Sequence, residues 1–368
     1  MLKDVCAINM GQSPDSNSYN DNGDGVPFFQ GNADFGERYP ITRKWCTAPT
    51  KMAAPNDILI SVRAPIGAMN YAKESCCIGR GLAALTPDKS KVSSEFIFWL
   101  MKCKNQELNS KGTGSTFKAI GRKVLEETLV PNITLEKQTE YSAILERVYA
   151  VIQARKTELQ KLDELVKARF VELFGDQKTN PFGWEQCTIG ECCTLKSGTS
   201  LPSEVENEGG PIPYIKVGDM NYPGNERYIT TSSRYVSEST AGKGLFEVGS
   251  ILFPKRGGAI GTNKKRMTKR PVCADLNVMG VSSKGRLRPE YLLAYFDMID
   301  LGALSDGSSV PQINNKNIAP LVICMPPLEL QEQFAAFVKQ TDKSKLAVQQ
   351  SLVKLELLKK ALMQKYFG

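Results

Sequence analysis

The sequence predicts an α+β protein in which two similar β-rich domains are separated by two long helices that pair as an antiparallel coiled coil. Three observations predict this fold class. Residues 135–175 and 326–368 have the apolar spacing of long helices. The residues before each of these stretches contain short β-branched runs that are typical of strands. The two halves of the chain are also alike, which indicates an internal repeat with pseudo-twofold symmetry.

The first long helix is predicted from Leu135 to Gly175. No glycine or proline occurs between Glu136 and Phe174, and apolar residues recur in alternating steps of four and three. This spacing is the seam of a coiled coil, and about 39 residues at 1.5 Å each make a rod of roughly 60 Å. Gly175 can take the left-handed conformation that commonly ends a helix.

The second long helix closes the chain. Residues 352–368 (LVKLELLKKALMQKYFG) repeat the pattern of residues 159–175 (LQKLDELVKARFVELFG). An antiparallel pair is simpler than a parallel pair, which would require the chain to double back about 60 Å. It would place the β-rich domains at opposite ends of the rod. The residues expected to pair the helices are Leu145, Val148, Ile152, Leu159, Leu162, Val166, Val348, Leu352, Leu355 and Leu362.

The repeat has a period near 193 residues and indicates a tandem duplication. Gly11 pairs with Gly198, and VPFFQGNAD at Val26 aligns with IPYIKVGDM at Ile212. NDILISVRAPIGA at Asn56 aligns with GSILFPKRGGAIG at Gly249, and GSTFKAI at Gly114 with GSSVPQI at Gly307. VPNITLEKQ at Val130 aligns with MPPLELQEQ at Met325. The expected organisation is a β-rich domain over 1–134, a helical region over 135–175, a second β-rich domain over 176–325 and a second helical region over 326–368.

Within the first copy, the residue pattern predicts short strands and one packed helix. The strands are expected at 26–30, 57–63, 77–79, 82–85 and near 129–131, and the helix at 95–101.

Composition excludes several classes of protein. The 368 residues include ten cysteines in no disulfide-framework spacing and no histidine. The absence of histidine removes histidine-based catalytic triads and imidazole metal sites. No apolar run approaches the roughly 18 residues of a membrane span, and residues 1–11 lack the apolar core of a signal peptide. These features predict a cytoplasmic protein with reduced thiols and no contact with a membrane.

The sequence contains no recognisable catalytic or cofactor motif. It has no G-x-x-x-x-G-K-[ST] phosphate loop and no G-x-G-x-x-G that opens a helix after a strand. The glycine-rich run Gly257–Gly261 could be a DNA-facing turn, a plain bulge or, least in keeping with its context, a mononucleotide cradle. We therefore expect no catalytic, cofactor-binding or metal-binding residues in this chain, and a protein that binds rather than reacts.

Double-stranded DNA is the partner that the charge pattern favours. The net charge is +8, and residues 255–270 (KRGGAIGTNKKRMTKR) hold seven basic residues and no acidic one. Lysine and arginine neutralise phosphates, and arginine, lysine, asparagine and glutamine read base edges. The candidate DNA-binding residues are Arg63, Lys118, Arg122, Lys255, Arg256, Lys264, Lys265, Arg266, Gln312, Asn314 and Asn315. For any one of them taken singly, surface solubility is the simpler explanation.

The sequence resembles the specificity (S) subunits of Type I restriction-modification systems. The resemblance covers essentially the whole chain. It is carried by MGQSP at 10–14, GTGSTFKAI at 112–120, VPNITLEKQ, MPPLELQEQ and the Phe-Gly ends of both helices. It implies two variable target-recognition domains, over 1–134 and 176–325, and a bipartite, asymmetric DNA target whose central gap is set by the helices. It assigns no catalytic residue to this chain and leaves the base-reading residues open.

The resemblance also implies partner subunits. Two methyltransferase (M) subunits that modify adenine would dock on residues 135–175 and 326–368, and ATP-dependent restriction (R) subunits would translocate and cleave DNA. S-adenosylmethionine, ATP and magnesium are then expected on the partner subunits. Because Thr341 and Lys345 interrupt the second seam, fraying or an M-subunit contact is expected near residues 341–345.

Other hypotheses remain open from the sequence. The chain could be a scaffold with two protein-binding modules on a coiled-coil spacer and no affinity for nucleic acid. It could also be the recognition subunit of another restriction-modification class, or an enzyme whose motifs are unfamiliar.

Overall fold

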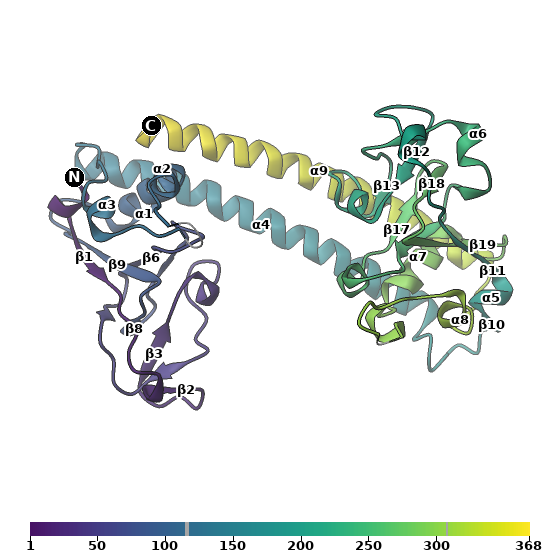
Figure 1. Ribbon diagram of the computed structural model, residues 1–368, viewed down its shortest axis with the longest axis horizontal. Coiled ribbons are helices and arrows are strands. Elements are labelled where there is room, and N and C mark those ends of the chain that lie inside the picture. The colour runs from purple at the N-terminus through teal and green to yellow at the C-terminus, as the bar shows by residue number, and fades with distance from the viewer. Residues whose placement is uncertain (115–117, 307) are drawn as a thin grey trace. The chain divides into compact units, whose positions relative to one another are not determined.

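The computed structural model describes residues 1–114, 118–306 and 308–368 (Figure 1). They form two compact units. Unit 1 consists of Met1–Lys156 and Gln349–Gly368, and unit 2 consists of Thr157–Val348. Each unit therefore contains one β-rich domain together with parts of both long helices. The centre of the loop at 112–120 and the start of its counterpart at Gly307 lie outside the described residues.

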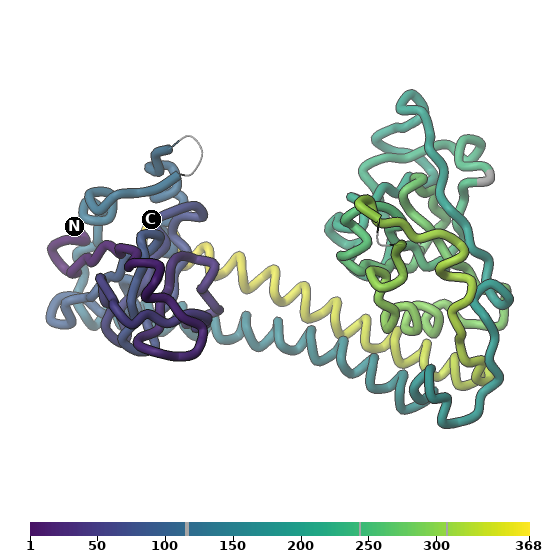
Figure 2. The backbone as a smooth tube through the Cα atoms, turned by 60° about the horizontal axis from the view of Figure 1, so that its bottom comes forward, coloured from purple at the N-terminus to yellow at the C-terminus, as the bar shows by residue number. Residues whose placement is uncertain are grey.

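The two long helices run antiparallel within each unit. They are α4 (Leu135–Phe174) and α9 (Leu328–Phe367). In unit 1, Tyr141 near the start of α4 stacks on Tyr366 near the end of α9, with ring centroids 4.0 Å apart, and Figure 2 shows the yellow end of α9 beside α4. In unit 2, the ring centroids of Phe170 near the end of α4 and Phe334 near the start of α9 are 5.5 Å apart. The predicted fold class is therefore confirmed.

The residues expected to pair the helices all lie on covered faces. Four of them are buried, namely Leu145, Ile152, Val166 and Val348. The other six are half-buried, namely Val148, Leu159, Leu162, Leu352, Leu355 and Leu362.

The fraying expected near residues 341–345 is wrong. α9 is continuous through this segment, and Thr341 is buried, with its hydroxyl donating a hydrogen bond to the backbone oxygen of Phe337 at 3.0 Å. The ammonium of Lys345 donates to Asp163 on α4 at 2.5 Å. A polar seam position is thus tolerated here because each polar group finds a partner on its own helix or on the facing one.

Unit 1 holds two sheets. The larger is antiparallel, in the order β1-β9-β6-β7, and consists of β1 (Cys6–Met10), β6 (Ile58–Ser61), β7 (Met69–Tyr71) and β9 (Leu82–Pro87). The smaller has the order β2-β4-β3-β8-β5 and consists of β2 (Tyr19–Asn20), β3 (Val26–Phe29), β4 (Trp45–Cys46), β5 (Met52–Ala53) and β8 (Cys76–Ile78). Its helices are α1 (Ser94–Cys103), α2 (Asn105–Ser110) and α3 (Arg122–Glu126), with short 3-10 turns at Leu2–Asp4, Ser16–Ser18 and Asn32–Asp34. The centre of α1, from Phe96 to Met101, is buried, because α1 lies between the larger sheet and α4 (Figure 1).

Unit 2 repeats this plan. Its larger sheet has the order β11-β19-β16-β17-β13 and consists of β11 (Cys193–Ser197), β13 (Tyr228–Ile229), β16 (Ile251–Pro254), β17 (Arg266–Thr268) and β19 (Val278–Ser283). Its smaller sheet has the order β14-β12-β18-β15 and consists of β12 (Ile212–Ile215), β14 (Tyr235–Val236), β15 (Leu245–Phe246) and β18 (Val272–Ala274). A two-stranded sheet pairs β10 (Gln186–Thr188) with β20 (Val322–Cys324). The helices are α5 (Ile189–Cys192), α6 (Glu238–Ala241), α7 (Pro289–Asp297) and α8 (Asn315–Ile318), with 3-10 turns at Ser203–Val205, Val217–Asn221, Gly242–Gly244, Gly258–Thr262 and Gly302–Leu304.

The duplication extends to single hydrogen bonds. Gly11 donates its backbone N–H to Leu82, and Gly198 donates to Val278, both at 2.9 Å. A Cβ atom at either glycine would lie 2.2 Å from a backbone oxygen, of Gly79 or of Asp275, so both copies require glycine at this close approach.

A buried glutamine in the first turn of each long helix corrects one part of the repeat alignment. The side-chain oxygen of Gln138 accepts from the backbone N–H of Ser93 at 3.0 Å, and that of Gln331 accepts from Arg288 at 2.8 Å. Because these two glutamines are equivalent, Gln138 aligns with Gln331. The pairing of Val130 with Met325 that the sequence suggested is therefore shifted by two residues.

The strand expected near 129–131 is wrong. These residues are irregular, whereas their counterparts in the second copy form β20. β20 is held in place by pairing with β10, whereas residues 129–131 pair with no strand among the described residues.

Candidate nucleic-acid interface

Each unit presents an exposed arginine just after a buried strand of its larger sheet. All residues of β6 and of β16 are buried, and Arg63 and Arg256 come two residues after those strands end. Arg63 forms an isolated backbone bridge with Ala119, and Arg256 forms one with Gln312. The two arginines therefore occupy equivalent places.

The loop that holds each arginine is fixed by matching backbone hydrogen bonds. Ile120 donates its N–H to Val62 in unit 1, and Ile313 donates to Lys255 in unit 2, both at 2.9 Å. Gly257, next to Arg256, has a φ of +75°, which favours glycine there. Both arginines are thus mounted on a rigid strand end rather than on a free loop.

The side chains of these arginines point to solvent with their charge unpaired. Among residues 1–114, 118–306 and 308–368, neither guanidinium has a hydrogen bond or an ion pair. In unit 1, Arg63 lines a cleft of about 450 Å³ together with Gln30, Asp34 and Arg80. Lys118, on the neighbouring loop, is also exposed. This surface can accept phosphate oxygens and offers an amide for a base edge.

The basic run of unit 2 divides into outward and inward side chains. Lys255 and Lys264 are both half-buried. Lys255 donates to the hydroxyl of Ser197 at 2.9 Å, and Lys264 donates to Asn221. Lys265, in contrast, is only 5% exposed, and its ammonium donates to the backbone oxygen of Ile299 at 2.6 Å. Burial lowers the pKa of Lys265 to about 8.

Lys265 and Arg266 are therefore corrections to the candidate set. The guanidinium of Arg266 donates to the backbone oxygens of Asn225 at 2.6 Å and Lys265 at 2.8 Å, which holds a loop of its own domain. Because Lys265 is buried and the donors of both side chains already bond within the fold, we leave both out of the proposed interface.

The remaining candidates lie at helix starts beside the bridged loops. Arg122 begins α3, is exposed and donates to Glu126 on the same helix at 2.7 Å. Gln312 is half-buried, while Asn314 and Asn315 are exposed at the start of α8. α3 and α8 are equivalent in the repeat, so Arg122 and Asn315 occupy the same place in the two units.

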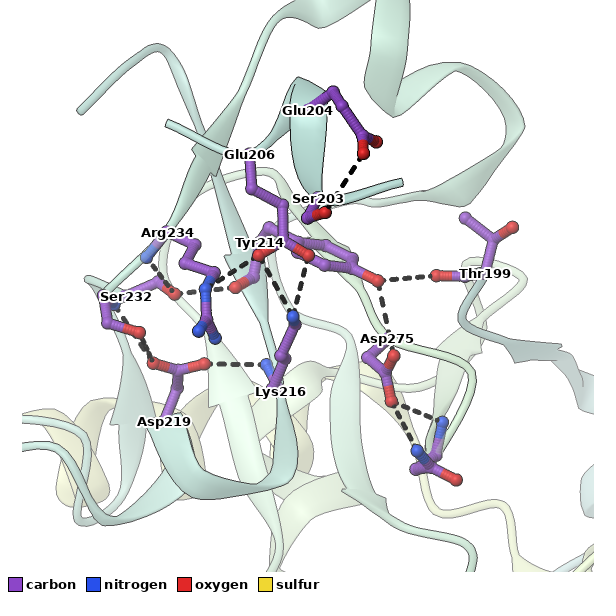
Figure 3. Close-up of polar contacts among 12 residues, drawn as sticks. Thr199, Ser203, Glu204, Glu206, Tyr214, Lys216, Asp219, Ser232, Arg234 and Asp275 are labelled. Carbon is purple, nitrogen blue, oxygen red and sulfur yellow. Dashed lines mark hydrogen bonds and ion pairs between the residues drawn. The ribbon is translucent and has the colours of Figure 1, made fainter. Parts of the chain in front are cut away.

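Sequence reasoning missed a pair of equivalent residues, Gln30 and Lys216, whose side chains have different surroundings in the two units. Gln30 and Lys216 each follow the first long strand of the smaller sheet, and each donates its backbone N–H to an aspartate, Asp34 at 2.7 Å and Asp219 at 2.8 Å. Gln30 is exposed, whereas Lys216 converges with Arg234 on Glu206 (Figure 3), with ion-pair distances of 2.7 Å in both cases. The alignment of VPFFQ with IPYIK contained the signal for this pair.

Two further findings concern the described ranges only. No group of three or more cysteine, aspartate or glutamate side chains there is arranged to hold a metal ion. No helix there is both long enough and apolar enough to cross a membrane.

Comparison with known sequences gives two specificity subunits among the relatives of this chain. The MjaX specificity subunit of a type I restriction enzyme from Methanocaldococcus jannaschii is 41% identical over 160 residues, which are 44% of this chain and 38% of that relative's length. The MjaIX specificity subunit of the same organism is 24% identical over 333 residues, which are 84% of this chain and 76% of the relative.

Solved structures show the same fold. The S subunit of a type I restriction-modification system from M. genitalium has a TM-score of 0.60 and 15% identity, covering 100% of this chain and 95% of that one. A second structure, solved for the complex assembly and conformational transition of the type I R-M system, has a TM-score of 0.60 and 20% identity, covering 100% and 96%.

The family model described as the Type I restriction modification DNA specificity domain matches residues 1–164 and 181–357. These two matches cover the two repeats that the hydrogen bonds of the fold reveal. The chain therefore belongs to the Type I restriction modification DNA specificity family.

Proposed function

We propose that this chain is the sequence-specific double-stranded DNA-binding subunit of a Type I restriction-modification complex. Each β-rich domain reads one half of a bipartite, asymmetric site, and α4 and α9 set the gap between the halves. The observation that carries the proposal is a pair of exposed arginines, Arg63 and Arg256, which have no charge partner among the described residues and are mounted on equivalent strand ends in two domains that otherwise differ in sequence.

Electrostatics and symmetry both support DNA as the partner. The chain has a net charge of +8, and guanidinium groups without an internal partner can release counterions from phosphates or form bidentate bonds with guanine. Because the neighbours of the two arginines differ, with Gln30 and Arg80 beside Arg63 and Lys255 beside Arg256, the two half-sites should differ as well.

We propose that the chain has no catalytic activity of its own and acts in the cytoplasm. Partner M subunits, two per chain, would carry S-adenosylmethionine and methylate adenine. R subunits would supply ATP- and magnesium-dependent cleavage. The chain would then contribute target choice alone, which agrees with the absence of catalytic motifs from its sequence.

An exposed apolar groove beside α9 in unit 1 is the proposed docking site for one M subunit. It has a volume of about 700 Å³, and its lining includes Lys102, Leu352, Val353 and Leu357. Val353 and Leu357 are each 62% exposed, which is unusual for two neighbouring apolar side chains on one helix face.

Leu357→Glu should therefore abolish co-purification of the M subunit while leaving the fold intact, because the side chain already faces water. Ile41→Glu is the matched control, since Ile41 is similarly exposed but lies in a loop of the β-rich domain. Equal retention of the M subunit by both variants would move the docking site elsewhere.

The proposed function is tested by selection from a randomised duplex DNA pool with the chain co-expressed with its M subunit. Enrichment of two unlike short sequences at one spacing, with affinity that falls steeply with salt, is the expected result. Binding without enrichment of any sequence would indicate non-specific electrostatic binding only. Absence of binding, or affinity that is flat between low and moderate salt, would favour a protein-binding scaffold instead.

A further inference from the structure

A three-residue motif recurs in both β-rich domains outside the candidate interface. It reads Glu37-Arg38-Tyr39 in the first and Glu226-Arg227-Tyr228 in the second. The backbone oxygen of Arg38 accepts from the N–H of Tyr71 on β7 at 2.9 Å, and that of Arg227 accepts from Met267 on β17 at 3.1 Å. The two arginines are therefore equivalent, each held against the corresponding strand of the larger sheet.

In unit 1 the motif arginine is tied to the long helix α4. One terminal nitrogen of Arg38 donates to Glu146 at 2.6 Å, and the guanidinium carbon lies 4.7 Å from the ring centroid of Phe98. The indole N–H of Trp99 donates to the same oxygen of Glu146 at 2.8 Å. The two charged side chains are only 23% and 32% exposed, so their geometry is far more restricted than that of a surface ion pair.

In unit 2 the motif arginine is tied to the long helix α9. Arg227 forms ion pairs with Asp297 on α7 at 3.4 Å and with Asp342 on α9 at 3.9 Å. The hydroxyl of Tyr228 also donates to Asp342.

A tyrosine–carboxylate hydrogen bond joins the motif to the long helix in both units, with the two groups exchanged. In unit 1 the tyrosine is on the helix, and Tyr149 donates to Glu37 of the motif at 3.2 Å. In unit 2 the tyrosine belongs to the motif and the carboxylate of Asp342 to the helix. The tyrosine–carboxylate hydrogen bond is thus present in both units, although the two residue types are exchanged between the motif and the helix.

The motif is the second polar attachment between each domain and its long helix, beside the apolar core that the two share. The first is the buried glutamine of the first helical turn, Gln138 or Gln331. At 1.5 Å per residue, Glu146 lies about 12 Å beyond Gln138, and Asp342 lies about 17 Å beyond Gln331. A second polar attachment at this distance from the first restricts the angle of the domain on the helix, because the apolar contacts between them are not directional.

We infer that Arg38 and Arg227 are positioning residues that fix the orientation of each recognition domain on its long helix and thereby set which half-site spacing is accepted. The consequence for DNA rests on the proposed function, but the orientation itself does not. One extra base pair turns a half-site by about 35° about the duplex axis and moves it by about 3.4 Å, so a domain held at one angle rejects the wrong spacing.

The orientation is tested without DNA by pulsed dipolar spectroscopy on the full chain. Spin-labelled non-natural residues at exposed Asp21, in the β-rich domain, and Glu140, on α4, report the distance between domain and helix. Wild type should give one narrow distance distribution. Arg38→Met should broaden it, because the glutamine attachment remains while the arginine attachment is lost. An unchanged narrow distribution in Arg38→Met would overturn the inference.

Two further variants separate positioning from mere stability. Glu146→Gln keeps an acceptor oxygen for Trp99 but removes the ion pair, so it should broaden the distribution as Arg38→Met does, and it serves if that variant does not fold. Ile78→Val weakens the buried core of the smaller sheet without touching α4 and should leave the distribution narrow. If Ile78→Val broadens the distance distribution as much as Arg38→Met does, then Arg38 contributes only to general stability and does not fix the orientation of the domain.

The spacing consequence is tested on duplexes that carry the selected half-sites at gaps changed by one base pair. Wild type bound to its M subunit should lose roughly tenfold or more in affinity on such a change, and Arg38→Met should lose less than about threefold while still requiring both half-sites. A sharp spacing preference in Arg38→Met would overturn the inference. Failure of wild type to select any sequence would overturn the proposed function, and the distance measurement would still decide the orientation.

Discussion

Replacing Phe334 with alanine will lower the free energy of unfolding of unit 2 by about 3–5 kcal/mol, the range for removing a fully buried aromatic ring. Phe334 is 0% exposed and lies at the start of α9. Its ring centroid is 5.5 Å from those of Phe170 and Phe174, and both rings meet it in edge-to-face geometry. The substitution therefore removes buried area and also two aromatic contacts that hold the end of α4 against the start of α9.

Tyr141 provides the matched control, because it occupies the position of Phe334 in the first repeat. It is only half-buried and stacks on Tyr366 at 4.0 Å, so Tyr141→Ala should cost about 1–2 kcal/mol. Hydrogen exchange measures the two units separately. Phe334→Ala should reduce protection in β16 and β19 and leave β6 and β9 protected, and equal losses in the two units would show that they unfold together.

The long helices were the part of the fold most open to prediction. A stretch without glycine or proline, carrying a heptad seam, leaves few alternatives to a helix, and α4 ends within one residue of the predicted position. The φ of +73° at Gly175 shows why the helix stops there. The β6 strand was also visible as a β-branched run, and the repeat alignment placed the segment of β16 opposite it, so the arginines that follow both strands could be identified.

The smaller sheets could not be predicted in the same way. Strands such as β2, β4 and β5 have two residues each, which is too short for any alternation of apolar and polar side chains to show. Their places are set by pairing with strands far away in the sequence, as when Phe28 of β3 pairs in parallel with Cys77 of β8. Such pairing is a property of the folded chain and not of a local window.

Charge alone did not predict which basic side chains bond within the fold. Lys265 and Arg266 belong to a basic run that suggests a solvated or DNA-facing loop, yet their positive groups bind backbone oxygens, including that of Ile299, 34 positions along the chain. In contrast, the motif that contains Arg38 and Arg227 was present in the sequence at a local offset of 189 residues. The offset between the two copies changes along the chain, so the sequence alone does not align the two motifs. The equivalent backbone hydrogen bonds of Arg38 and Arg227 show that the two arginines correspond.

Arg63→Ala and Arg256→Ala will each relax the recognition of one half-site and leave the other half unchanged. Loss of a bidentate contact to a base costs about 1–3 kcal/mol, so affinity for the intact site should fall roughly 5- to 150-fold in each case. The fold should be retained, because both guanidinium groups face solvent and have no partner among the described residues. Selection from a randomised pool with each variant shows which half of the site becomes degenerate.

Lys89→Ala removes the same charge from an exposed turn of the first domain and controls for non-specific electrostatics. If Arg63 only neutralises a phosphate, then Arg63→Ala will lower the salt dependence of binding by about one counterion, Lys89→Ala will leave it unchanged, and neither variant will relax the sequence. If Arg63 reads a base, only Arg63→Ala will change the selected sequence. Because the two arginines belong to different domains and share no contacts, the free-energy losses in the double variant should add. A single degenerate half-site in both single variants would contradict the assignment of one half-site to each domain, since it would place both arginines on the same half of the target.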